Sequence, residues 1–159
     1  MTAALWQISR GTDTAYVIVS ATAIEDLLEK ALLGKMRTLT RTAYADLFRG
    51  YGPLSTFSAK IDLAFALKII DQESKTDFHI IREIRNKFAH APRMAHFEKE
   101  DLQPVFQKLR GYKKGVDTQK LFDYHVVELA KIINPHADRS IFADALKGAS
   151  RPETSPDKS

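Results

Sequence analysis

The chain has 159 residues, of which 44% are hydrophobic and 28% are charged, with a formal net charge of +4 and no cysteine. This balance is that of one globular domain, which can bury roughly two-thirds of its unfolded surface without metals or disulfides. The lack of cysteine excludes disulfides, thiolate catalysis and cysteine-ligated zinc.

The N-terminal segment gives no sign of secretion or membrane insertion. Residues 1–10 lack a basic stretch followed by an apolar run, and the most apolar segment, 15–24, is only about half as long as a membrane span. We therefore expect a cytoplasmic protein with no membrane partner.

Apolar residues recur with a helical period almost throughout the chain, and no sustained alternation indicates a strand. We expect an all-α fold, a single bundle of about six to eight helices over residues 1–148. The first short helix, 3–9, should end at Gly11. Asp13 should then cap a long, central helix over residues 14–33, since aspartate is a favoured N-cap.

The later helices follow from the same period and from their capping residues. Asp71 can cap one end of the helix 72–90, and Pro92 disfavours helix at the residue before it. Residues 149–159 are rich in Ser, Pro and charge, so we expect a disordered tail there. The other expected helices cover residues 42–49, 56–70, 102–110, 118–133 and 140–147.

Arg85 is the most unusual residue of the helix 72–90, because it points toward that helix's apolar stripe. The stripe consists of Phe78, Ile81, Ile84 and Phe88. A buried, unpaired charge is costly, so a carboxylate should pair with Arg85. The candidates from neighbouring helices are Asp62, Glu25 and Asp26.

A polar flank on the same helix and the preceding Gly-Pro turn suggest an interaction surface. The turn and the flank should bracket one buried helix, and together they comprise Gly50, Gly52, Pro53, His79, Arg82, Asn86 and His90. We expect Lys60 to extend its ammonium outward to solvent. His79, His96, His125 and His136 lack paired metal-ligand spacing and should lie on the surface, so we expect no metal and no cofactor.

Two basic segments, 30–49 and 108–120, could attract a polyanion. Tyr112 could add a stacking ring to the second segment if the ligand were a nucleic acid. No recognition helix, zinc finger or basic zipper is visible. Binding of nucleic acid would therefore not be sequence-specific by any visible motif.

The hexapeptide Arg85-Asn86-Lys87-Phe88-Ala89-His90 resembles the Arg-polar-x-x-x-His motif of HEPN domains, many of which are metal-independent endoribonucleases. The resemblance implies that His90 accepts the 2′-hydroxyl proton, Arg85 holds the phosphate and Asn86 orients one of them. Two motif helices face each other across a dimer in such enzymes. On one helix, residues five apart differ by roughly 140°, so a single motif does not converge on one phosphate.

A longer resemblance covers residues 47–71 and 78–90, which are similar to the mannitol operon repressor family. It implies an all-helical bacterial protein that represses the operon for mannitol uptake and oxidation. Because no DNA-reading motif is visible, we expect a regulatory module that acts through a protein partner, with homodimerisation as a further expectation. No catalytic residue is favoured, and the HEPN-type ribonuclease remains the alternative.

Overall fold

The computed structural model describes residues 3–91 and 95–137, with side chains from Asp13 onward. Within these ranges all regular structure is helical, which confirms the all-α fold. The expected helix over 140–147 and the expected tail lie outside the described residues. The elements are α1 (Ala3–Gly34), α2 (Arg41–Phe48), α3 (Phe57–Ala66), α4 (Gln72–Ala89), the 3-10 helix η1 (Glu100–Leu102), α5 (Gln103–Phe106) and α6 (Thr118–Ile133).

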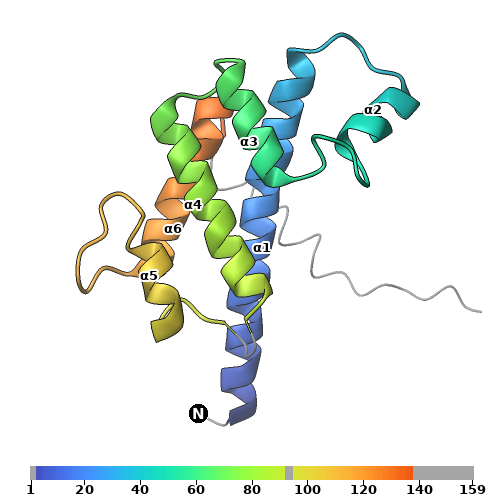
Figure 1. Cartoon of the computed structure of the whole chain (residues 1–159). Coiled ribbons are helices and arrows are strands. Elements are labelled where there is room, and N and C mark those ends of the chain that lie inside the picture. The colour runs from blue at the N-terminus through green and yellow to red at the C-terminus, as the bar shows by residue number, and fades with distance from the viewer. Residues whose placement is uncertain (1–2, 92–94, 138–159) are drawn as a thin grey trace, which may run out of the picture.

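Helix α1 is the central element of the bundle, and α3, α4 and α6 pack against it (Figure 1). It can contact three helices because its middle is apolar on nearly all sides. Its fully buried residues are Val17, Ala21, Ile24, Leu28 and Leu32. Helix α2 stands to one side of the bundle, between two loops (Figure 1).

The expected break at Gly11 is wrong, because α1 continues through it as one helix. Glycine inside a helix costs only about 1 kcal/mol relative to alanine, which the packing of a long helix can offset. Asp13 is therefore not an N-cap. Its Oδ2 atom accepts a hydrogen bond from the backbone N–H of Phe97 at 3.3 Å and so connects α1 to a distant loop.

Helix α3 ends at Ala66, four residues earlier than expected. Lys68 has a φ of 57°, in the left-handed region, and there the chain turns toward α4. This turn buries Ile70 and leaves Leu67 exposed. The early end also brings Asp71 to the start of α4, where its Oδ1 accepts a hydrogen bond from the N–H of Ser74 at 2.8 Å.

Helices α4 and α6 follow the expected pattern closely. The apolar stripe of α4, Phe78, Ile81, Ile84 and Phe88, is at most 2% exposed. Helix α6 has the predicted bounds and is capped by Asp117, whose Oδ1 accepts a hydrogen bond from the N–H of Lys120. The segment expected as one helix over 102–110 is shorter and consists of η1 and α5.

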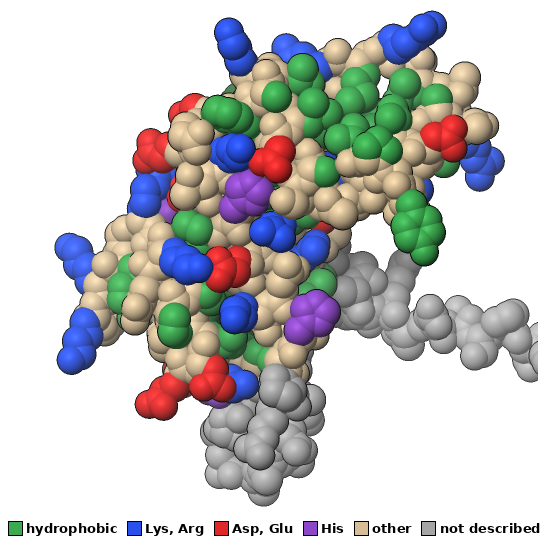
Figure 2. Space-filling model, in the orientation of Figure 1, with side chains coloured by type: hydrophobic (Ala, Val, Ile, Leu, Met, Phe, Trp, Pro, Cys, Tyr) green, Lys and Arg blue, Asp and Glu red, His purple; other side chains and the backbone are tan. Residues whose placement is uncertain are grey.

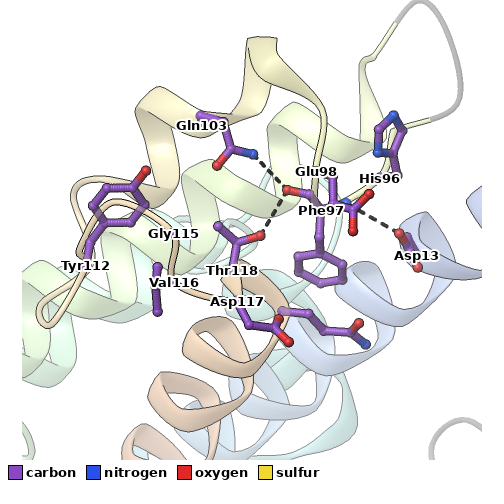
Figure 3. A pocket seen from close by; sticks show the side chains of 11 residues that line it. Asp13, His96, Phe97, Glu98, Gln103, Tyr112, Gly115, Val116, Asp117 and Thr118 are labelled. Carbon is purple, nitrogen blue, oxygen red and sulfur yellow. Dashed lines mark hydrogen bonds between the residues drawn. The ribbon is translucent and has the colours of Figure 1, made fainter.

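Phe97 anchors the connection between α4 and α5 to the core. Its ring packs against Phe88, Phe106 and Phe122, with centroids 5.4, 5.7 and 5.8 Å away. Its carbonyl accepts hydrogen bonds from Gln103 and Thr118 (Figure 3). Because ring and backbone are both held, this loop is part of the folded core.

Candidate ligand and partner surfaces

Arg85 forms an ion pair with Glu25 of α1. Its Nη1 donates to Glu25 Oε2 at 3.0 Å, and its guanidinium lies 5.6 Å from the ring centroid of Phe57. The Arg85 side chain is 27% exposed, so it is only partly removed from water. The pair links α4 to α1.

The other two candidate carboxylates do not contact Arg85. Asp62 lies on the outer side of α3 and pairs with Lys75 at 3.0 Å and His79 at 3.3 Å. The hydrogen bond from Lys75 is the main reason why the pKa of Asp62 is below its ordinary value. Asp26 is exposed, with no ion pair to any residue that the structure describes.

Lys60 points inward, so the expectation that it extends to solvent is wrong. The residue is 3% exposed, and its Nζ lies 2.8 Å from Glu25 Oε1 and 2.8 Å from Glu29 Oε2. Two carboxylates offset the cost of removing one ammonium from water. Lys60, Glu25, Glu29 and Arg85 are called the Lys60 cluster below.

Two groups of the Lys60 cluster, Lys60 and Glu29, have pKa values shifted toward their charged forms. Burial opposes the charge of Lys60, but hydrogen bonds to Glu25 and Glu29 outweigh it and raise the pKa of Lys60. Burial also opposes ionisation of Glu29, but hydrogen bonds from Lys60 and Tyr44 outweigh it and lower the pKa of Glu29. Arg49 also pairs with Glu29, at 3.4 Å, and so connects the end of α2 to the cluster.

The sequence does contain a signal for this cluster, in the spacing of two glutamates. Glu25 and Glu29 are four residues apart, so they share one face of a helix that is otherwise apolar. Two carboxylates on a buried face require cations from a neighbouring helix. Lys60, in the apolar helix α3, was the available cation.

The six-residue motif divides its side chains between two cavities. The arginine cavity, of about 430 Å³, is lined by Glu25, Ser55, Thr56, Phe57, Ser58, Arg82, Arg85 and Asn86. The histidine cavity, of about 420 Å³, is lined by Glu83, Asn86, Lys87, His90, Ala91, Lys99, Asp101 and Leu102. Only Asn86 borders both of them. Arg85 and His90 therefore do not converge on one ligand within a single chain.

His90 ends α4 as its C-cap, and its backbone N–H donates to the carbonyl of Asn86 at 3.0 Å. Its side chain is exposed at the rim of the bundle. A histidine at this position is also favoured simply by the negative end of the helix dipole. Its placement therefore does not require a catalytic role.

The structure brings together only part of the expected interaction surface. Arg82 and Asn86 line the arginine cavity and His90 lines the next one, whereas His79 contacts Asp62. The turn residues Gly50, Gly52 and Pro53 precede the start of α3 and line neither cavity. Gly52 is required sterically, because an added Cβ would lie 2.5 Å from the carbonyl oxygens of Asp46 and Leu47.

His125 is buried, so its expected surface position is wrong. It is 2% exposed, its Nε2 lies 2.8 Å from the carbonyl oxygen of Arg110, and its Nδ1 lies 3.6 Å from Asp77 Oδ2. Arg110 Nε also donates to Asp77, at 3.1 Å. The sequence does not reveal that His125 faces inward, because the carboxylate close to its ring, Asp77, lies on another helix, α4.

The three residues Asp77, Arg110 and His125 are called the Asp77 cluster. Burial raises the pKa of Asp77 above its ordinary value, and the charge of His125 opposes that rise only in part. Arg110 is 57% exposed, so water screens its charge. Asp77 is thus less well compensated than the carboxylates of the Lys60 cluster.

A third cavity, of about 720 Å³, lies beside the Phe97 loop (Figure 3). Three of its polar side chains bind the backbone of Phe97: Asp13 accepts from the N–H, while Gln103 and Thr118 donate to the carbonyl (Figure 3). Burial raises the pKa of Asp13. This arrangement serves to hold the loop.

Figure 2 shows hydrophobic side chains gathered over the C-terminal end of α1 and over α2. Partly buried apolar residues of this region are Met36, Leu39, Tyr44, Leu47 and Leu54. Tyr51, in the turn after α2, is fully exposed. These residues and Tyr51 are called the α2 flank.

The geometry defines an all-α helical bundle with a buried charge cluster, two surface cavities along α4 and an apolar flank. In the described part of the chain, no three potential ligands are grouped to hold a metal ion, and no helix has the length and apolarity to cross a membrane. No family model matches the chain, and neither a curated protein nor a solved structure matches it.

Proposed function

We propose that this protein is a non-catalytic regulatory module, similar in role to the mannitol operon repressors, that acts by binding another protein. The observation that carries the proposal is the α2 flank. Apolar side chains gather there on an element that stands apart from the bundle (Figures 1 and 2). Contiguous exposed apolar surface is typical of sites that bind other proteins.

Tyr51 is the residue of this flank best suited to anchor a partner. It is fully exposed, and exposed aromatic side chains contribute disproportionately to protein interfaces. The close backbone packing at Gly52 holds the turn that presents it. Arg49, Tyr44 and Glu29 bind one another and tie α2 to the bundle.

The motif helix supports the non-catalytic part of the proposal. Arg85 is engaged by Glu25, and His90 opens into a different cavity. A general base and a phosphate-binding group must both reach one reacting phosphate. Within one chain these two residues do not meet that requirement.

The regulatory role can be tested with a reporter gene under the mannitol operon promoter of the source organism. We expect the protein to lower reporter expression and Tyr51→Ala to relieve that repression. Tyr124→Ala is the matched control, because Tyr124 is an exposed tyrosine on α6. Equal repression by all three proteins, at equal abundance, would refute the role of the flank.

Direct operator binding would make a protein partner unnecessary. A gel-retardation assay with operator and scrambled duplexes distinguishes the two cases. We expect any retardation to disappear equally for both duplexes as salt rises, since only phosphate contacts would be involved. Retardation of the operator alone at high salt would contradict the proposal.

The HEPN-type ribonuclease is the second candidate, and the exposed position of His90 at the end of α4 favours it. Two copies of the chain would have to bring Arg85 of one and His90 of the other together. We expect no cleavage of labelled single-stranded RNA in EDTA. Cleavage that His90→Ala abolishes, and that the exposed-residue control His136→Ala retains, would establish the ribonuclease instead.

A further inference from the structure

Arg82 has no structural explanation within the described chain. Its Nε is buried without a hydrogen-bond partner, and the guanidinium forms no ion pair with a described residue. Buried polar atoms almost always have a partner, so an unpaired one requires a reason. Arg85, one turn further along α4, does have its partner in Glu25.

Further donors surround Arg82 in the arginine cavity. The hydroxyls of Ser55 and Ser58 line it and make no hydrogen bond to any described residue. Thr56 differs, because its hydroxyl caps α3 by accepting from the N–H of Ala59 at 3.2 Å. The cavity thus offers one free guanidinium and two free hydroxyls to a ligand.

Arg85 adds a second guanidinium whose orientation is already fixed. Its Nη1 is held by Glu25, and its plane is steadied by the ring of Phe57. Its Nη2 makes only a long contact, 3.5 Å, with Asn86 Oδ1. That nitrogen can therefore donate to a ligand without breaking the ion pair.

The charge balance of the cavity favours an anion although Glu25 forms part of its wall. Both oxygens of Glu25 are bound, one by Lys60 and one by Arg85. The Lys60 cluster has two cations and two carboxylates and is neutral. Arg82 is an additional positive charge that no described carboxylate offsets.

We propose that the arginine cavity binds a phosphate monoester, with Arg82 and the Nη2 of Arg85 donating to the phosphoryl oxygens and Ser55 and Ser58 completing the set. Arginine recognises phosphate through parallel N–H donors, and hydroxyls from a second element match a tetrahedral group. The volume of about 430 Å³ accommodates a phosphoryl group with a small organic portion. A monoester presents three terminal oxygens to these donors, whereas a diester presents only two, so the monoester can accept more of the available hydrogen bonds.

The proposal is independent of the regulatory role and is tested by calorimetric titration of the full chain with methyl phosphate. Ionic strength is kept constant with chloride, at a pH where the monoester is a dianion. We expect saturable binding, with dimethyl phosphate binding more weakly. Arg82→Gln should weaken methyl phosphate binding by roughly tenfold or more, because a charged hydrogen-bonding group is lost.

Matched variants distinguish binding of methyl phosphate in the arginine cavity from general attraction of an anion to positive charge. Arg37→Gln removes an exposed arginine outside the cavity and should leave the affinity unchanged. Ser55→Ala and Ser58→Ala should each weaken binding by a smaller factor. Arg82 has no ion pair to lose, so thermal unfolding of Arg82→Gln should match that of the wild type and exclude misfolding.

Three results would overturn the proposal. One is the absence of saturable methyl phosphate binding at millimolar concentration, and another is equal affinity of Arg82→Gln and Arg37→Gln. The third is Arg82-dependent binding of a short single-stranded RNA that methyl phosphate does not displace. That last result would assign the cavity to a polynucleotide surface.

Discussion

Helix α4 contributes to two charge clusters, and they are compensated in different ways. Near its C-terminal end, Arg85 joins the Lys60 cluster, in which two cations meet two carboxylates. Near its start, Asp77 is 2% exposed and faces His125 and a half-exposed Arg110. A cation that is buried together with a carboxylate lowers the pKa of that carboxylate, as at Glu29, whereas burial beside a half-exposed arginine leaves the pKa raised, as at Asp77.

The two clusters should respond to pH in opposite directions. The folded state lowers the pKa of Glu29, so its stabilising effect is complete above the ordinary pKa and is lost as pH falls through the lowered one. The folded state raises the pKa of Asp77, so its contribution is largest at low pH and is lost as pH rises through the raised one.

The largest expected effect comes from removing the central cation of the Lys60 cluster. Lys60→Met should lower the free energy of unfolding by about 3–5 kcal/mol, because two buried carboxylates lose their shared partner. Urea denaturation measures it. Lys131→Met, which breaks an exposed pair with Glu128, is the control and should cost less than about 1 kcal/mol. Similar losses for both variants would mean that burial of the cluster is unimportant.

Removing one carboxylate should have a smaller effect and should alter the acid response. Glu29→Gln should cost about 1–3 kcal/mol at neutral pH, because Lys60 keeps Glu25. Below pH 4.5, the ordinary pKa of the carboxyl, the gap between variant and wild type should narrow. Chemical denaturation across this range measures it, and a gap independent of pH would contradict the assigned pKa direction.

Arg85→Ala should cost less still, about 1–2 kcal/mol, because the side chain is partly exposed and Glu25 retains Lys60. This is a smaller loss than a fully buried ion pair would give. Thermal and urea unfolding measure it, with Arg37→Ala as an exposed control. A loss as large as that of Lys60→Met would show that Arg85, and not Lys60, is the main partner of Glu25.

Asp77→Asn should have the smallest effect at neutral pH, because it removes a charge that burial disfavours. The wild type should lose stability as pH rises from about 3.8, the ordinary pKa, through the raised pKa of Asp77, and the variant should lose less. Unfolding curves between pH 3.5 and neutrality, compared with those of Asp46→Asn at an exposed aspartate of α2, measure the difference. Identical pH profiles for wild type and Asp77→Asn would contradict the raised pKa of Asp77. The two clusters would then not differ in how their stability depends on pH.

Features decided by short stretches of sequence could be predicted well. The cap at Asp71, the apolar stripe of α4 and the bounds of α6 each depend on residues within one or two turns. The end of α3 could not be predicted in this way, because the left-handed turn at Lys68 is favoured by the burial of Ile70 against other helices.

The candidate sites are even harder to predict from the sequence, because they depend on contacts between helices. The sequence singled out Arg85, Asn86 and His90 and narrowed the partner of Arg85 to three carboxylates. It did not show that Asn86 stands between two separate cavities. It also placed Lys60 and His125 at the surface, because a buried polar side chain can be recognised only once its partners on other helices are known.

The all-α bundle, its main helices and the helix that carries the charged motif can be predicted from the sequence, because periodicity and capping act over a few residues. Tertiary structure decided which charges are buried, which partners they meet and which cavities they line. These outcomes depend on residues such as Glu25 and Arg85, which are sixty positions apart and are brought together only by packing of α1 against α4.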